Sequence, residues 1–159
     1  RALAIGIVAI GALGLASLFS HDFLLYNHST SIPRGIYLRV DAPIGAGSIV
    51  TVRAIDVAPA YARRQHFADA GDRFIKRVAA ANGDEVCASG PVLQINGRVV
   101  ARRSERDSEG RALPTWSGCR VLSEDEVFLL GDTDDSFDGR YWGPISRDQI
   151  EGVWRFVSL

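Results

Sequence analysis

Nineteen consecutive uncharged residues, Ala2 to Ser20, follow the first residue of the chain. As a helix rising about 1.5 Å per residue, this run would extend about 28 Å, close to the roughly 30 Å hydrocarbon core of a bilayer. Its apolar residues occupy every helical face, so an amphipathic helix on a membrane surface is excluded. We therefore expect a transmembrane anchor over residues 1–20. A cleaved signal peptide is the alternative, because the run contains residues small enough for a cleavage site: Ala12, Gly14, Ala16 and Ser17.

Charges on either side of this run favour one orientation. Arg1 precedes it, and His21 and Asp22 follow it, which favours an N-terminus inside and the remaining chain outside. The whole chain carries 18 Lys and Arg against 19 Asp and Glu, and this balance lacks the basic excess of a nucleic-acid-binding protein. The sequence therefore predicts a membrane anchor followed by one exported domain over residues 21–159, with no nucleic-acid partner.

The exported part is predicted to be mainly β. Short β-branched or alternating runs bounded by Gly and Pro indicate strands at 35–40, 47–53, 92–95, 98–101, 126–130 and 152–157. Asn96-Gly97, between two of these runs, is the strongest short signal for a hairpin. One helix is expected over 57–68, where Pro59 suits the first turn. The very polar segment 102–110 is expected to be a solvated loop.

Two cysteines, Cys87 and Cys119, fall in the exported part. An oxidising compartment permits a disulfide between them, which would close a loop containing the hairpin. Two buried free thiols are the alternative. No CxxC or HxxxH spacing is present, which argues against a zinc site. The aspartates near residue 135 lack the spacing of a calcium-binding EF-hand loop, so we expect no metal.

Lys76 is the only lysine among the 18 basic residues, and it lies within an apolar, strand-like run. Burial beside Phe74, Ile75 and Val78 would lower the pKa of its amine and provide a neutral base near pH 7. A hydroxyl such as that of Ser136 could hold the amine by a hydrogen bond. The only histidines are His21, His28 and His66.

Three polar clusters, in order along the chain, resemble the conserved boxes of the membrane-bound signal peptidase I superfamily, whose members use a Ser-Lys dyad. NHSTSIPRGIY (27–37) is similar to the nucleophile box of the conjugal-transfer branch, the TraF-type peptidases that mature pilins. RFIKRV (73–78) resembles the lysine box, and GDTDDSFDGRYWG (131–143) resembles the last box. The sequence departs from the common pattern at Ile32, Thr133 and Gly139, none of which removes a catalytic atom.

The resemblance implies the coiled antiparallel β-sheets of signal peptidases, with a hairpin insert over about 85–125. It makes Ser31 the nucleophile and Lys76 the general base. The Ser31 backbone N–H and the Ser29 hydroxyl would hold the oxyanion, and Ser136 would orient the lysine. Asp138 and Arg140 are expected to form an ion pair that shapes the last cluster, with a solvated surface pair as the alternative.

The implied function is that of a serine endopeptidase anchored by a single span in the bacterial inner membrane, with its catalytic domain on the periplasmic side. Its partners would be the lipid bilayer and an exported preprotein or pilin precursor, and the reaction would need no cofactor. One alternative is a housekeeping signal peptidase I that removes signal peptides from many preproteins. Another is a membrane-tethered assembly factor without catalysis.

Overall fold

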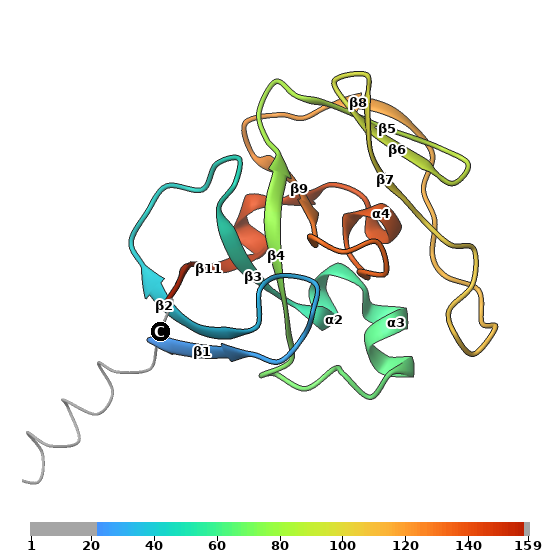
Figure 1. The fold of residues 1–159 in the computed structure, drawn as a ribbon. Helices are drawn as coiled ribbons and strands as arrows, with labels where there is room; N and C mark the ends of the chain where they lie inside the picture. Colours follow the sequence, from blue (N-terminus) through green and yellow to red (C-terminus); the bar gives the residue numbers. More distant parts are fainter. Residues whose placement is uncertain (1–21, 158–159) are drawn as a thin grey trace, which may run out of the picture.

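The computed structural model describes residues 22–157 (Figure 1). The membrane anchor expected for residues 1–20 lies outside these residues. Within the described part, none of the helices is long and apolar enough to cross a bilayer.

Across residues 22–157 the chain is mainly β, as predicted, and its strands form two antiparallel sheets. The seven-stranded sheet has the order β1-β2-β11-β3-β4-β9-β10, and the four-stranded sheet has the order β7-β6-β5-β8. The strands are β1 (Leu24–Asn27), β2 (Gly35–Val40), β3 (Ile49–Arg53), β4 (Arg73–Ala80), β5 (Glu85–Ser89), β6 (Val92–Ile95), β7 (Arg98–Arg102), β8 (Gly118–Val121), β9 (Glu126–Leu130), β10 (Ile145–Ser146) and β11 (Ile150–Phe156).

The helical elements are short. They are α2 (Ala54–Val57), α3 (Pro59–Arg64), α4 (Gly139–Trp142) and the 3-10 turn η1 (Arg147–Gln149). Figure 1 shows β4 running through the middle of the molecule, with the four-stranded sheet beyond one end of it and α2 and α3 beside it. The chain enters the four-stranded sheet through the short turn between β4 and β5 and returns to the larger sheet between β8 and β9.

The core lies where the two sheets meet and inside the larger sheet. One buried cluster joins β9 to the four-stranded sheet. Its largest fully buried members are Val86, Leu93, Leu122 and Phe128. A second cluster, with Val50, Val52, Val78, Val127 and Leu129, packs between β3, β4 and β9. Burial of this kind contributes about 25 cal/mol for each Å² of apolar surface removed from water, so these clusters hold β4 firmly in place.

The predicted helix over 57–68 is wrong in its extent. The chain instead forms α2 and α3, separated at Ala58, whose φ of −144° and ψ of 60° break the helical backbone. Pro59 begins α3, as expected for the first turn. The helix ends after Arg64, and His66 adopts a φ of 52°, which a helix does not permit.

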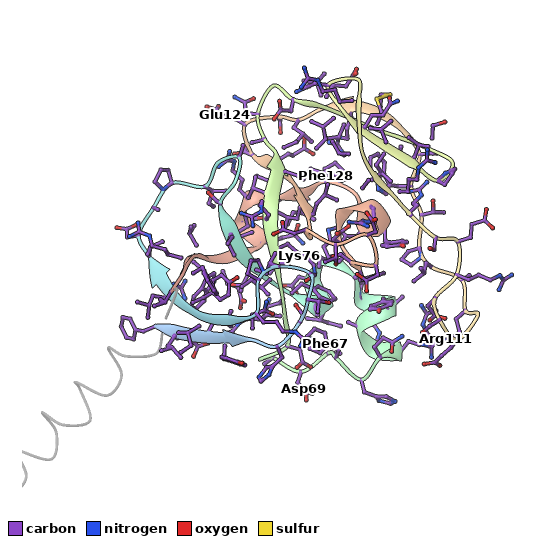
Figure 2. The ribbon with its side chains drawn as sticks, viewed as in Figure 1. Phe67, Asp69, Lys76, Arg111, Glu124 and Phe128 are labelled. Atoms are coloured by element: carbon purple, nitrogen blue, oxygen red, sulfur yellow. A yellow bond between two sulfur atoms is a disulfide. The ribbon has the colours of Figure 1, made fainter. Side chains whose placement is uncertain are left out.

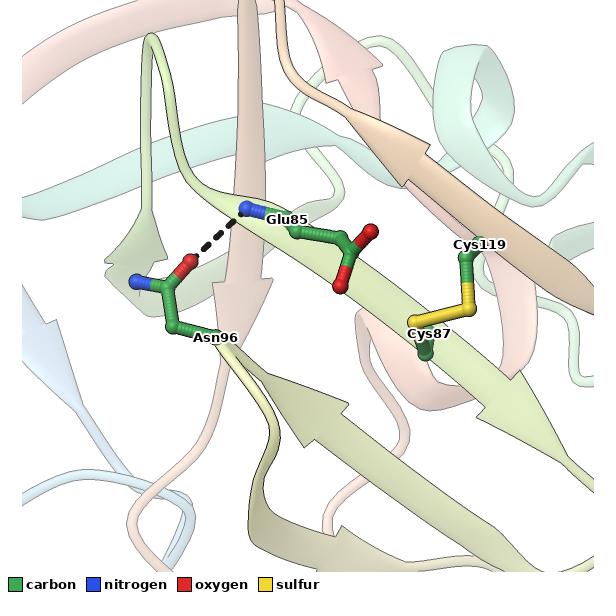
Figure 3. Close-up of a disulfide and its surroundings, with 4 residues drawn as sticks. All are labelled: Glu85, Cys87, Asn96 and Cys119. Atoms are coloured by element: carbon green, nitrogen blue, oxygen red, sulfur yellow. Dashed lines mark hydrogen bonds between the residues drawn. A yellow bond between two sulfur atoms is a disulfide. The ribbon is translucent and has the colours of Figure 1, made fainter.

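The hairpin predicted from Asn96-Gly97 is confirmed. Asn96 has a φ of 50° and Gly97 a φ of 76°, the two left-handed residues that a type I′ turn requires. The side chain of Asn96 also ties the turn to the neighbouring strand, because its Oδ1 accepts a hydrogen bond from the Glu85 backbone N–H at 2.9 Å (Figure 3). The turn is therefore fixed both by its own backbone and by β5.

Cys87 on β5 lies directly opposite Cys119 on β8, and a disulfide joins them across 32 residues of sequence (Figure 3). β8 is a four-residue edge strand with every residue exposed. Apolar burial therefore contributes little to holding β8 against β5, and the disulfide is its main attachment in addition to the backbone ladder.

Reduction of this disulfide is expected to lower the free energy of unfolding by roughly 3–4 kcal/mol, the value of the chain-entropy model for a loop of this length. The cysteines lie in the smaller sheet, whereas Lys76 belongs to the larger one. Thermal stability should therefore fall more than initial activity does. Unfolding curves and initial rates measured with and without reductant check this, with Cys87→Ala/Cys119→Ala as the matched variant. Two freely alkylated thiols in protein purified without reductant would contradict it.

Candidate active site

Ser31 lies in the loop that connects β1 to β2. The ladder between these strands ends with Asn27 opposite Gly35, so the loop leaves and re-enters the sheet at neighbouring points. Ile32, next to Ser31, is buried in a cluster with Tyr37, Ile75 and Trp154. The packing of Ile32 in this cluster fixes the loop against the sheet, and Ser31 itself is only 7% exposed.

Lys76 lies on β4, and its Nζ is 2.7 Å from the Ser31 Oγ. The two side chains meet although 45 residues separate them in sequence. Lys76 is 5% exposed, and Figure 2 shows it near the middle of the molecule. The structure thus brings together the two residues that the sequence assigns to the dyad.

Aromatic rings form the apolar wall around this amine. The Phe74 ring centroid is 5.9 Å from Lys76 Nζ. Phe74 in turn packs against Phe67 and Phe137, with ring centroids 5.4 and 5.8 Å away. Phe137 stacks on Tyr61 of α3 at 3.5 Å. Tyr61 of α3 thus supports the rings that pack beside one side of the lysine.

Burial lowers the pKa of Lys76 from 10.5 to about 8. Loss of hydration is the largest cause, because a charged amine is less stable away from water. Asp138 opposes this shift and Arg140 reinforces it. With such a pKa the amine is partly neutral near neutral pH, as a general base must be.

Ser29 is the second hydroxyl of the loop. Its Oγ is 3.1 Å from the Ser31 Oγ, and it donates a hydrogen bond to Asn27 Oδ1 at 2.8 Å. Ser29 is exposed, in contrast to Ser31. The Ser29 hydroxyl thus lies beside that of Ser31, and its oxyanion role stays a prediction.

The Asp138–Arg140 pair is buried, and the surface alternative is wrong. Asp138 is 0% exposed and Arg140 2% exposed, and Arg140 Nε lies 2.9 Å from Asp138 Oδ1. The Asp138 carboxylate also accepts the backbone N–H of Gly131 at 2.7 Å and that of Arg140 at 3.0 Å. The guanidinium donates to the carbonyls of Asp134 and Thr133 at 2.5 and 3.0 Å. The pair thus fixes the loop over 131–138.

Ser136 lies in this loop and lines the same pocket as Lys76. Its Oγ is buried without a hydrogen-bond partner, so the expected contact with the lysine amine is not formed here. A Cβ on Gly131 would lie 2.2 Å from this Oγ and 2.9 Å from the Ser31 carbonyl oxygen. Only glycine at position 131 allows the Ser136 segment to approach the loop that carries Ser31 this closely. The orienting role of Ser136 stays a prediction.

Asp132 contacts the backbone of Ser31 in a way that the sequence did not indicate. Its backbone N–H donates to the Ser31 carbonyl oxygen at 2.5 Å. Its carboxylate accepts two hydrogen bonds from Arg77, at 2.9 and 2.7 Å, and the Arg77 bonds lower the pKa of this carboxyl. Because Arg77 follows Lys76 on β4, this pair ties the lysine strand to the backbone of Ser31.

These groups open into a pocket of about 600 Å³. Segments 25–31 and 71–76 line it, together with Thr51, Phe67, Thr133 and 135–137. Among residues 22–157 no group of three His, Cys, Asp or Glu side chains is arranged to hold a metal ion. The pocket holds the buried Ser31 hydroxyl, the Lys76 amine with its lowered pKa, and the Ser29 hydroxyl. Acyl transfer through a serine ester needs groups of these kinds.

Several known proteins are similar to this chain. A family model described as signal peptidase, peptidase S26, matches residues 1–159. A plasmid transfer protein TraF of Escherichia coli is 35% identical over 149 residues, covering 82% of this chain and 80% of that protein. A second plasmid transfer protein TraF of Escherichia coli is 33% identical over 170 residues, covering 99% and 96%.

Among solved structures, a signal peptidase I from Enterococcus faecalis V583 has 20% sequence identity and a TM-score of 0.40, covering 72% of this chain and 98% of that one. The family model spans the entire sequence, and the two TraF proteins share a third of their residues with it. The chain therefore belongs to the peptidase S26 family of signal peptidases and, within the signal peptidase I superfamily, to the TraF branch.

Proposed function

We propose that this protein is a membrane-anchored serine endopeptidase that uses a Ser31–Lys76 dyad to process exported proteins, with a pilin precursor of conjugal transfer as its substrate. The observation that carries the proposal is the 2.7 Å approach of Lys76 Nζ to Ser31 Oγ between two buried side chains. The similarity to plasmid transfer proteins TraF supports the link to conjugal transfer.

In the first half of the reaction, Ser31 Oγ gives its proton to the neutral Lys76 amine and attacks the scissile carbonyl carbon. The backbone N–H of Ser31 and the Ser29 hydroxyl stabilise the resulting oxyanion. The Lys76 ammonium then protonates the leaving nitrogen, and the C–N bond breaks. The products of this half are a Ser31 ester, a free amine and a neutral Lys76.

In the second half, Lys76 takes a proton from water, and the oxygen of that water attacks the ester. Collapse of the intermediate returns the Ser31 oxygen, which regains its proton from the Lys76 ammonium. An amine in place of water would form a new peptide bond and cyclise the pilin. Both outcomes use the same two residues and no cofactor.

The remaining chain is assigned to support this reaction. Residues 1–20 anchor the protein in the bacterial inner membrane by a single span, and residues 21–159 form the periplasmic peptidase domain, with the insert over about 85–125. Ser136 orients the lysine amine once substrate fills the pocket. A site beside the bilayer suits an exported substrate that is itself still attached to the membrane.

Co-expression of the full-length chain with the pilin precursor of the same conjugative system tests the proposal by intact-mass spectrometry. Wild-type protein should shorten the precursor, and a further loss of one water mass would identify cyclisation. Ser31→Ala should abolish processing, whereas Ser29→Ala should slow it by about 10²–10³-fold, the usual effect of removing one oxyanion donor. Processing by Ser31→Ala, or equal residual rates in the two variants, would contradict these roles.

A further inference from the structure

Asn27 is the last residue of β1, four positions before Ser31, and it is only 4% exposed. It belongs to the cluster that resembles the nucleophile box, but neither the reaction nor the oxyanion assignment uses it. A buried carboxamide needs partners for both of its ends, because a polar group left unpaired in the interior is destabilising. The partners that Asn27 finds all belong to the loop that carries Ser31.

The donor end of Asn27 holds the loop backbone on both sides of Ser31. Its Nδ2 lies 3.2 Å from the Ser29 carbonyl oxygen, 3.1 Å from that of Ile32 and 3.0 Å from that of Pro33. With two hydrogens and three acceptors, the NH₂ group is fully used. One side chain thus connects the segment before the nucleophile with the segment after it.

The acceptor end of Asn27 holds Ser29 alone. Its Oδ1 accepts from the Ser29 backbone N–H at 3.0 Å and from the Ser29 Oγ at 2.8 Å. Because Ser29 is exposed, packing does not select its rotamer, and water would otherwise compete for the hydroxyl. Asn27 therefore selects the rotamer in which the Ser29 Oγ lies 3.1 Å from the Ser31 Oγ.

We propose that Asn27 is a positioning residue that holds the Ser29 hydroxyl beside Ser31, so that it is ready to turn from the Asn27 carbonyl to the developing oxyanion. This inference rests on the proposed function. In the resting site the Ser29 proton points to Asn27 Oδ1. In the transition state the negative oxygen is the stronger acceptor, and rotation about the Cβ–Oγ bond transfers the hydrogen bond without moving the loop.

A double-mutant cycle on the full-length chain tests this role, with cleavage of the same pilin precursor as the readout. Asn27→Ala is expected to reduce kcat by about 10²-fold, the effect of displacing a reacting group by about 1 Å. It should leave KM nearly unchanged, because the Ser29 contact is made only in the transition state. In the Ser29→Ala background the loss caused by Asn27→Ala should be at least about tenfold smaller.

Tyr37→Phe is the matched control. The Tyr37 hydroxyl donates to the Pro33 carbonyl oxygen at 2.6 Å and so supports the same loop through Pro33 rather than through Ser29. Tyr37→Phe should reduce kcat by the same factor, within about twofold, in the wild-type and the Ser29→Ala backgrounds. A purely structural role of Asn27 would behave in the same way, because a smaller folded fraction lowers the rate by one factor in both backgrounds.

Equal losses from Asn27→Ala in the two backgrounds would therefore overturn the positioning role, even with Ser31→Ala inactive. Cleavage by Ser31→Ala, or no cleavage by the wild-type chain, would instead overturn the proposed function. The two failures are thus distinguishable.

Discussion

Lys76→Arg is expected to be inactive, with processing reduced by at least about 10⁴-fold, although the positive charge is retained. A guanidinium is a far weaker acid than an ammonium and does not release its proton in the working range of an enzyme. In the proposed mechanism the neutral Lys76 amine, whose Nζ lies 2.7 Å from the Ser31 Oγ, accepts the Ser31 proton. The variant removes only that ability, so precursor cleavage measured from about pH 6 to about pH 10 should show no recovery at the alkaline end.

The wild-type rate should follow the neutral fraction of Lys76. With a pKa of about 8, about one tenth of the amine is neutral at pH 7, against well under a thousandth for a lysine in water. The rate should therefore rise through a midpoint near pH 8 and level off on the alkaline side. A profile that is flat from pH 6 upward would mean that another group is the base.

Stability measurements provide an independent check on the same pKa. In the unfolded chain Lys76 titrates near 10.5, and in the folded chain at about 8. Between these values the unfolded state binds more protons, so the free energy of unfolding should rise as the pH increases from 8 to 10.5. Below pH 8 the full penalty remains, roughly 3 kcal/mol at about 1.4 kcal/mol per pH unit. Lys76→Met should lose both activity and this contribution to the pH dependence.

The histidine alternative predicts the reverse pattern. His28 is exposed and packs edge-on against the Tyr26 ring, with the centroids 4.6 Å apart. If it were the base, His28→Ala would be inactive and Lys76→Arg would be tolerated. We expect His28→Ala to retain activity, and a trace at most from Lys76→His, whose shorter imidazole does not reach the same point. An active Lys76→Arg enzyme would overturn the mechanism.

Sequence reasoning succeeded where the signal is local. The Asn96-Gly97 turn was predictable because two adjacent left-handed residues are costly for most side chains. It failed for β8, whose four residues are all exposed and show no alternation. β1 was also missed, because its residues directly follow a long apolar run and are too few to show a period. The helix boundary at Ala58 did have a sequence signal that the expected helix over 57–68 did not use. Ala58 precedes Pro59, and the residue before a proline is disfavoured in the helical region.

The candidate site was predictable to a similar degree. A lone lysine in an apolar strand indicated a buried amine, and resemblance to the signal peptidase boxes selected Ser31 as its partner. The hydrogen bonds that the Asn27 side chain and the Asp132 N–H make to backbone carbonyls, such as those of Ile32 and Ser31, were not predictable. Any residue offers a backbone carbonyl, so such bonds leave no pattern in composition or spacing. Only the folded loop shows which carbonyls are within reach.

The buried pair behind the loop over 131–138 should be as sensitive as the dyad. Asp138→Asn leaves the Arg140 guanidinium, 2% exposed, without its counter-charge. Arg140→Met leaves the Asp138 carboxylate buried and frees the carbonyls that the guanidinium held. Each change should lower the free energy of unfolding by about 3–5 kcal/mol, the cost of an uncompensated buried charge. The double variant Asp138→Asn/Arg140→Met buries no charge and should recover part of this loss in thermal unfolding.

The two single variants should also shift the pH–rate profile in opposite directions. The Asp138 carboxylate raises the pKa of Lys76, and the Arg140 guanidinium lowers it. Asp138→Asn should therefore move the midpoint of the remaining activity below pH 8, whereas Arg140→Met should move it above pH 8. A merely structural effect lowers the rate at all pH values without moving the midpoint. If Lys76 is the titrating base, loss of the Asp138 charge and loss of the Arg140 charge must shift the midpoint in opposite directions. Shifts in the same direction would contradict that assignment.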